Sequence, residues 1–148
     1  MSAELIQPIA WRPDFTTGVG IIDDQHRVLI KMLNEASTRL TDQSSLEELA
    51  KIVQGLINYA DYHFKTEERF IVEQGYERLR PVDAEAHLAQ HRDFVSKVLA
   101  VREQIHQGQR VPKDVLVSFL SEWLTHHILH TDKALGAFLL DQKQRAAQ

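Results

Sequence analysis

Four long stretches of this sequence place apolar residues three or four positions apart, and this periodicity constrains the fold more than any other feature. One side of an α-helix has this spacing, whereas a half-buried strand alternates every second residue. The expected helices run over residues 23–40, 46–74, 83–106 and 112–140. No stretch shows strand-like alternation. The sequence therefore predicts an all-α fold.

Capping residues separate the predicted helices. Asp23 is the expected N-cap of the first helix. Before the second helix, Ser44 with Glu47 and Ser45 with Glu48 both fit a capping box. Gly75 is the expected stop of the second helix, and Pro112 is expected in the first turn of the fourth. Long helices with short connections are typical of an antiparallel up-down-up-down four-helix bundle.

Three segments make up the predicted domain organisation. Residues 1–22 read as an irregular arm packed on the bundle, because prolines and glycines interrupt an otherwise apolar stretch. Residues 23–142 form the four-helix domain, and residues 143–148 form a polar tail expected to fray. A loop over residues 76–82 is expected between the second and third helices.

Composition excludes several classes of function. The chain has 148 residues, which suits one domain, and its net charge of −4 argues against nucleic acid or an anionic membrane as a partner. It has no cysteine, which excludes disulfides, thiolate zinc sites, iron–sulfur clusters and cysteine nucleophiles. The sequence has no apolar run of about 20 residues and no signal-peptide pattern at its start, so we expect a cytoplasmic protein outside the membrane.

The chain contains 8 histidines, and their positions are ordered. His63 and Glu67 are four apart on the second helix, as are His87 and His91 on the third, so each pair shares a helix face. On the fourth helix His127 and Asp132 are five apart. That spacing turns them about 140° around an α-helix, so they are not expected to stack on one ion, but one could hold an ion while the other reaches sideways to bridge. The first helix contributes His26.

Each of these features alone usually has an ordinary explanation as a surface pair, a cap-adjacent side chain or a solvated carboxylate. Together they provide five imidazoles and two carboxylates that can face one bundle core. A single zinc ion uses only four ligands. Two six-coordinate ions with both carboxylates bridging would use the whole set, and a mixture of imidazole and carboxylate suits iron.

These residues resemble the hemerythrin family, and specifically its single-domain bacterial members. The resemblance covers nearly the whole chain, through WRPDFTTGVGIIDDQHRVL (11–29), YADYHFKTEE (59–68), HLAQHRDF (87–94) and WLTHHILHTD (123–132). It implies a non-haem di-iron centre, Fe2+ or Fe3+, with an oxo or hydroxo bridge. One iron would be held by His87, His91 and His127, the other by His26 and His63, with Glu67 and Asp132 bridging both.

The resemblance also implies that O2 binds at the open position of the iron that has two histidines. The side chains that match the family's apolar O2 pocket are Leu29, Phe64, Trp123, Leu124 and Ile128. From pattern alone, these five residues read as ordinary core. A dry pocket is consistent with reversible O2 binding, because water promotes loss of the oxygen ligand.

Some features depart from the family or require a choice. Nineteen residues separate Glu67 from His87, more than the family suggests, and the extra length within residues 76–86 is expected at the end of the bundle. His127 is chosen over the adjacent His126, since the pattern HIxxxD begins at His127. The remaining histidines, His106 and His130, are expected on the surface, and Glu68 is expected to face solvent.

Three functions remain in competition. The first is reversible O2 binding for storage, delivery or scavenging, and this is our reading, with no enzymatic activity expected. The second is a di-iron oxidoreductase acting on O2, peroxide or nitric oxide. Such enzymes carry two Glu-x-x-His motifs, whereas this chain has only Glu103-x-x-His106. The third is an O2 or redox sensor. O2 is the expected partner of a monomer, and a protein client is left open.

Overall fold

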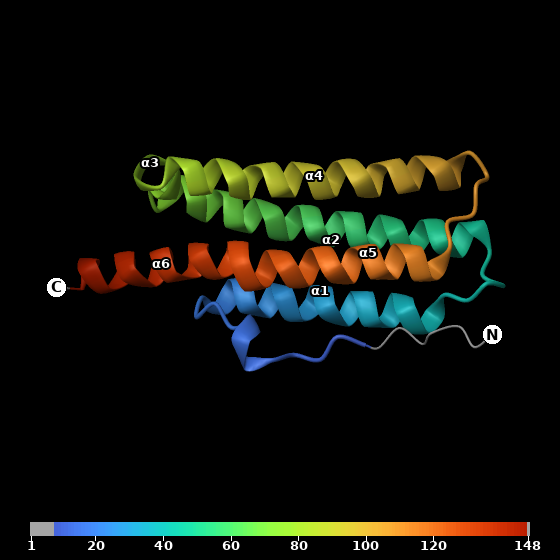
Figure 1. The fold of residues 1–148 in the computed structure, drawn as a ribbon, viewed down its shortest axis with the longest axis horizontal. Coiled ribbons are helices and arrows are strands. Elements are labelled where there is room, and N and C mark those ends of the chain that lie inside the picture. The colour runs from blue at the N-terminus through green and yellow to red at the C-terminus, as the bar shows by residue number, and fades with distance from the viewer. Residues whose placement is uncertain (1–7, 148) are drawn as a thin grey trace.

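Four long helical rods lie side by side and antiparallel in the computed structural model, which describes residues 8–147 (Figure 1). The rods are α1 (Gly20–Arg39), α2 (Leu46–Glu73), α4 (Pro81–His106), and the continuous run of α5 (Lys113–His126), π-helix η2 (His127–Asp132) and α6 (Lys133–Ala146). No strand occurs within the described residues. The predicted all-α, up-down-up-down four-helix bundle is confirmed. None of the helices within residues 8–147 is long and apolar enough to span a bilayer.

The first helix begins at Gly20, three residues before the predicted start, and Val19 occupies its N-cap position. Asp23 is therefore not the N-cap. Its Oδ1 accepts hydrogen bonds from the Thr17 backbone N–H (2.8 Å) and hydroxyl (2.7 Å), and its Oδ2 accepts one from the Gly18 N–H (3.2 Å). The carboxylate still satisfies amide donors, as a capping residue would, but these donors belong to the arm.

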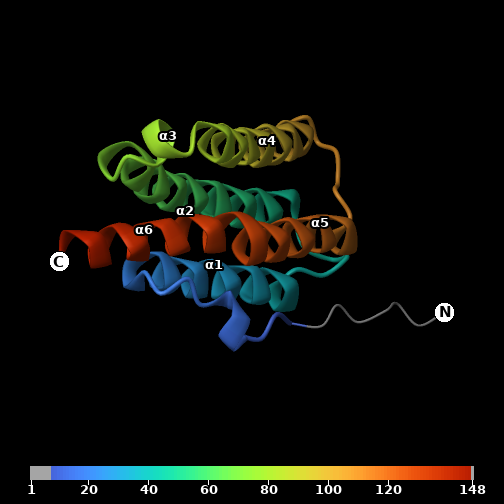
Figure 2. The same cartoon turned by 60° about the vertical axis from the view of Figure 1, so that its left-hand side comes forward.

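The connection between the second and third rods is more regular than predicted. Gly75 has a φ of 81° just beyond α2, in agreement with its predicted role as the stop. The expected loop is wrong, because residues Tyr76–Leu79 form the short helix α3 and Pro81 begins α4. Tyr76 is only 2% exposed and packs on Phe138 of α6 with a ring separation of 4.9 Å. Figure 2 shows α3 at the end of the bundle, where the longer connection was expected.

The start of α2 agrees with the prediction, and the ends of the last rod differ from it by a few residues. Ser45 caps α2, since its hydroxyl accepts a hydrogen bond from the Glu48 N–H at 3.1 Å. Pro112 lies just before α5 rather than in its first turn. The tail predicted to fray continues α6 as far as Ala146.

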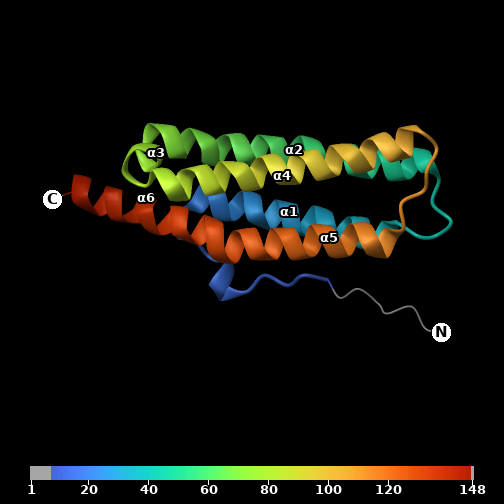
Figure 3. The ribbon, with the colours of Figure 1, turned by 45° about the horizontal axis from the view of Figure 1, so that its top comes forward.

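The arm before α1 follows the outside of the bundle (Figure 3). It contains the short 3-10 helix η1 (Pro13–Phe15), whose Phe15 is buried. Ile9 and Asn34 exchange two hydrogen bonds of 2.9 Å, and the Arg27 guanidinium lies 4.3 Å from the centre of the Trp11 ring system. Residues 1–7 of the predicted arm lie outside the described residues.

Two apolar clusters fill the interior. The larger cluster begins at Phe15 and Leu29. It continues along the parts of α2, α4 and α5 that contain Leu56, Phe94 and Leu120. The smaller consists of Ile22, Ile71, Tyr76, Ala84, Leu135, Phe138 and Leu139. On every rod a few residues between these clusters are polar, so a polar layer crosses the core.

The contact between the arm and α6 gives a prediction about stability. A Cβ on Gly136 would lie 2.8 Å from the carbonyl oxygen of Thr17, so Gly136→Ala requires the arm to move. We expect a loss of about 1–2 kcal/mol in the free energy of unfolding, measured by urea denaturation.

The matched control is Gly55→Ala in α2, where the nearest atom to a new Cβ is the Met32 Cε at 4.0 Å. Removing the flexibility of a mid-helix glycine without a clash stabilises by about 0.5–1 kcal/mol. Equal stabilisation by both substitutions would contradict the close packing of the arm on α6.

Candidate metal centre

The polar layer contains all seven side chains that the sequence singles out as metal ligands. They come from four rods: His26 from α1, His63 and Glu67 from α2, His87 and His91 from α4, and His127 and Asp132 from η2. None of the seven is more than 3% exposed. Side chains of this kind are almost never fully buried without a partner.

The π-helix explains how His127 and Asp132 come to lie together. The prediction that they point about 140° apart assumed α-helical geometry and is wrong. In η2 the backbone has the wider π-helical turn, in which each hydrogen bond spans five residues. The two side chains therefore lie on one face, with 3.1 Å between His127 Nε2 and Asp132 Oδ1.

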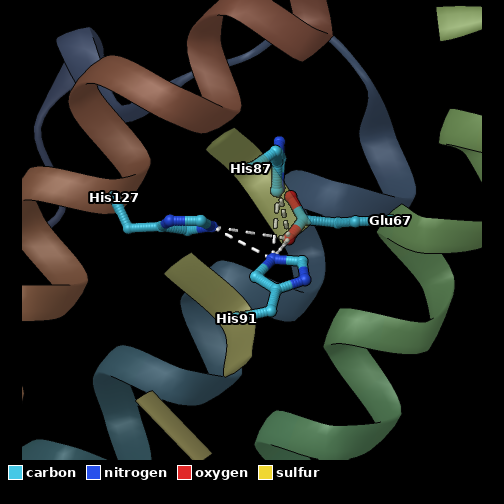
Figure 4. A group of neighbouring side chains, drawn as sticks. All are labelled: Glu67, His87, His91 and His127. Atoms are coloured by element: carbon cyan, nitrogen blue, oxygen red, sulfur yellow. Dashed lines mark hydrogen bonds and ion pairs between the residues drawn. The ribbon is translucent and has the colours of Figure 1, made fainter. Parts of the chain in front are cut away.

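One group of ligands consists of His87, His91, His127 and Glu67 (Figure 4). Their Nε2 atoms face a common point, with 3.1 Å between His87 and His91 and 3.2 Å between His91 and His127. Nitrogens held about 2.1 Å from one ion, at adjacent octahedral positions, lie about 3.0 Å apart. The spacing of these imidazoles therefore fits a shared metal ion.

The second group consists of His26, His63, Glu67 and Asp132. His63 Nε2 lies 3.2 Å from Glu67 Oε1, and His26 Nε2 lies 2.8 Å from Asp132 Oδ2. Glu67 belongs to both groups. Asp132 also faces both, because its Oδ1 lies 3.3 Å from His87 Nε2 while its Oδ2 faces His26. The two carboxylates thus lie between a set of three imidazoles on one side and a set of two imidazoles on the other.

The carboxylates and histidines of the layer shift one another's pKa values. Burial raises the pKa of Glu67, but His63 and hydrogen bonds from neighbouring groups outweigh burial and hold that pKa well below its usual value. Burial and the nearby Glu67 raise the pKa of Asp132, whereas the charge and hydrogen bond of His127 lower it, and the net shift of this pKa is downward. Burial lowers the pKa of His127, and Asp132 with Glu67 overcomes this and raises it to about 10. Both carboxylates are therefore anions that require nearby positive charge.

Several of these atoms lack a hydrogen-bond partner within residues 8–147. They are both ring nitrogens of His26, His63 Nε2, Glu67 Oε2, His87 Nδ1 and both Asp132 oxygens. His26 Nε2 and Asp132 Oδ2 are close, but their orientation does not form a hydrogen bond. A buried polar atom without a partner costs about 1–3 kcal/mol. One cation within each group would satisfy the Nε2 and carboxylate atoms, so the residues present fit a pair of metal ions.

Glutamines hold two of the imidazoles from behind. His63 Nδ1 donates to Gln25 Oε1 and His127 Nδ1 donates to Gln90 Oε1, both at 2.7 Å. Because an amide oxygen can only accept, each Nδ1 carries the proton and each Nε2 is free to face the centre. No sequence pattern indicated this role for the glutamines, although Gln25 directly precedes His26 and Gln90 directly precedes His91.

Threonines position the same glutamines. Gln25 Nε2 donates to the Thr66 hydroxyl at 3.1 Å, and the Thr131 hydroxyl donates to Gln90 Oε1 at 2.8 Å. Thr66 thus holds the amide nitrogen of Gln25, which leaves the amide oxygen directed at His63. Thr131 holds the amide oxygen of Gln90 itself, which is directed at His127.

An apolar cavity of about 30 Å³ adjoins the polar layer. Its walls are Leu29, Leu33, Leu56, Ala60, Phe64, Phe94, Leu120, Trp123 and Leu124. Four of the five predicted pocket residues are among them, whereas Ile128 is fully buried in the larger cluster without lining this cavity. Phe64 stacks on His91 with ring centres 3.9 Å apart, and Trp123 stacks on His127 at 4.5 Å. The cavity and the two imidazoles thus share these aromatic walls.

The other histidines lie outside the centre. His126 and His130 are exposed on the far face of their rod with ring centres 4.5 Å apart, and His106 is exposed at the end of α4. The buried position of His127 agrees with its choice over His126. Glu68 departs from its prediction, since its side chain is 41% exposed but its Oε2 lies 2.9 Å from His91 Nδ1.

Comparison with known proteins identifies the family. The family model described as hemerythrin HHE cation binding domain matches residues 17–139. Bacteriohemerythrin from Methylococcus capsulatus is 33% identical over 127 residues, covering 85% of this chain and 92% of that protein. Myohemerythrin from Theromyzon tessulatum is 26% identical and covers 89% and 94%. A crystal structure of wild-type hemerythrin superposes with a TM-score of 0.78 at 32% identity, covering 88% of this chain and 97% of that one. The chain belongs to the hemerythrin family.

Proposed function

We propose that this protein binds O2 reversibly at a non-haem di-iron centre. The observation that carries the proposal is the layer of seven buried ligands, arranged as two groups that share Glu67 and Asp132. In this proposal His87, His91 and His127 hold one iron, and His26 and His63 hold the other. When bound, the iron pair supplies the electrons and the coordination position that O2 requires.

The unequal number of imidazoles supports a defined place for O2. One ligand group contains three histidines and the other contains two, while both carboxylates face both groups. With equal coordination numbers, the two-histidine side keeps one more position for an external ligand. O2 is the ligand that we assign to that position.

The apolar surroundings support reversible binding. The cavity beside the layer is lined only by hydrophobic residues, including Phe64 and Trp123. A cavity of this kind stays dry and admits small apolar molecules. Excluding water protects the bound state from hydrolytic side reactions. These walls support a carrier rather than a catalyst, as does the histidine-rich ligand set, which lacks the paired Glu-x-x-His motifs of di-iron enzymes.

An anaerobic titration tests the proposal. The purified protein is assayed for iron, reduced, exposed to O2 while its visible spectrum is recorded, and then freed of O2. We expect about two irons per chain, following the two ligand groups, and a colour that appears and disappears with O2. Rapid irreversible oxidation would instead indicate an enzyme or a redox sensor, and absence of iron would refute the centre.

Substitution of single ligands tests the residue assignment. His63→Ala and Glu67→Ala each remove a buried ligand, so we expect lower iron content and loss of the O2-dependent colour. His130→Ala is the matched control, because it removes an exposed imidazole outside both groups. Normal iron content and spectrum in both ligand variants would show that these side chains do not bind the metal.

Removal of the metal should weaken the fold. Without cations the buried carboxylates and imidazoles have unmet bonding requirements, so metal binding contributes directly to folding. We expect chelation to lower the melting temperature by about 10 °C or more, equivalent to several kcal/mol for a domain of this size. Anaerobic addition of Fe2+ should restore it, and equal melting temperatures before and after chelation would argue against a structural contribution of the metal.

A further inference from the structure

Three imidazoles of the centre have a partner at Nδ1, and one of these partners differs in charge. Gln25 and Gln90 hold His63 and His127 through neutral amide oxygens at 2.7 Å. His91 instead faces the carboxylate of Glu68 at 2.9 Å. A carboxylate that accepts from an imidazole N–H raises the basicity of the ring more than an amide does.

Glu68 and Glu67 are adjacent on α2 and reach His91 from its two ends. Glu67 Oε1 lies 3.2 Å from His91 Nε2, and Glu68 Oε2 lies 2.9 Å from Nδ1. Phe64 stacks on the flat face of the same ring, with 13° between the ring planes. The orientation of His91 is thus fixed by three side chains of one helix.

The position of Glu68 places a negative charge directly behind one ligand, His91. His91 is 3% exposed while the Glu68 side chain is 41% exposed, so the carboxylate connects a buried ligand to solvent. His87, the neighbour of His91 on α4, has no hydrogen-bond partner at Nδ1 within the described residues. Among the three-histidine group, His91 is therefore the ligand with an anionic support.

We propose that Glu68 is a positioning residue that directs His91 Nε2 toward the metal and, through its charge, favours the oxidised state of the centre and hence retention of O2. The inference rests on the proposed function. A negative charge behind a metal ligand stabilises the more positive metal state, and second-shell hydrogen bonds are a general means of tuning metal sites. Since O2 binding draws electrons from the metal pair, the same charge strengthens O2 binding.

Two substitutions separate position from charge. Glu68→Gln keeps an oxygen that can accept from His91 Nδ1 and removes the charge, whereas Glu68→Ala removes both. Glu73→Gln is the matched control, because Glu73 is an exposed carboxylate on the same helix and has no contact with a ligand among the described residues. It makes the same change in net charge.

The measurements are the reduction potential, the rate of iron loss to a chelator, and the O2 dissociation constant. We expect Glu68→Gln to retain its iron, bind O2 roughly tenfold more weakly and show a higher potential, by about 30 mV if the couple transfers two electrons. Glu68→Ala should also weaken iron binding about 10–100-fold. Glu73→Gln should match the wild-type protein in all three measurements.

The outcomes distinguish this inference from the proposed function. If the wild-type protein binds two irons and O2 reversibly, but Glu68→Gln has the same potential and O2 affinity as Glu73→Gln, the role of the Glu68 charge is refuted and the carrier function stands. If Glu68→Ala retains iron as firmly as the wild-type protein, the positioning role is refuted. If the wild-type protein binds no iron, the proposed function itself fails.

Discussion

Burial of five imidazoles and two carboxylates in one layer is the constraint on which the rest of this structure depends. The layer lies between two apolar clusters, where water is not available to solvate charge. Its two carboxylates are held as anions, and several of its atoms are left without hydrogen bonds. Cations bound in this layer would resolve the conflict, and the chemistry of the centre and the stability of the bundle would then have one origin.

The backbone adapts to the centre at one place above all. The three rods α1, α2 and α4 present their ligands from α-helices. The fourth rod changes to the π-helix η2 for the six residues from His127 to Asp132 and then returns to an α-helix. This local widening allows one rod to present an imidazole to one ligand group and a carboxylate to both. Short π-helical segments are frequently found at functional sites.

The sequence predicted those parts of the fold and centre that follow from regular α-helical geometry. The pairs His63/Glu67 and His87/His91 lie on single faces because both are four residues apart in α-helices. The relation of His127 to Asp132 was not predictable from that periodicity, because η2 departs from it. The roles of Gln25 and Gln90 depend on contacts between rods, with histidines that are 38 and 37 residues away in sequence, respectively. No local pattern encodes contacts of that range.

The arrangement of the ligands along the chain has a consequence for how the centre assembles. Glu67, His87 and His91 come from α2 and α4, which are joined by the compact α3 corner, and can meet early. His26 and Asp132 lie 2.8 Å apart but about 100 residues apart in sequence, a contact of the kind that forms slowly. A chain emerging from the ribosome therefore has a partial ligand set long before it has a complete one. All seven candidate ligands come together only once the last rod packs against the first, so metal binding by the full set would report that the bundle is complete.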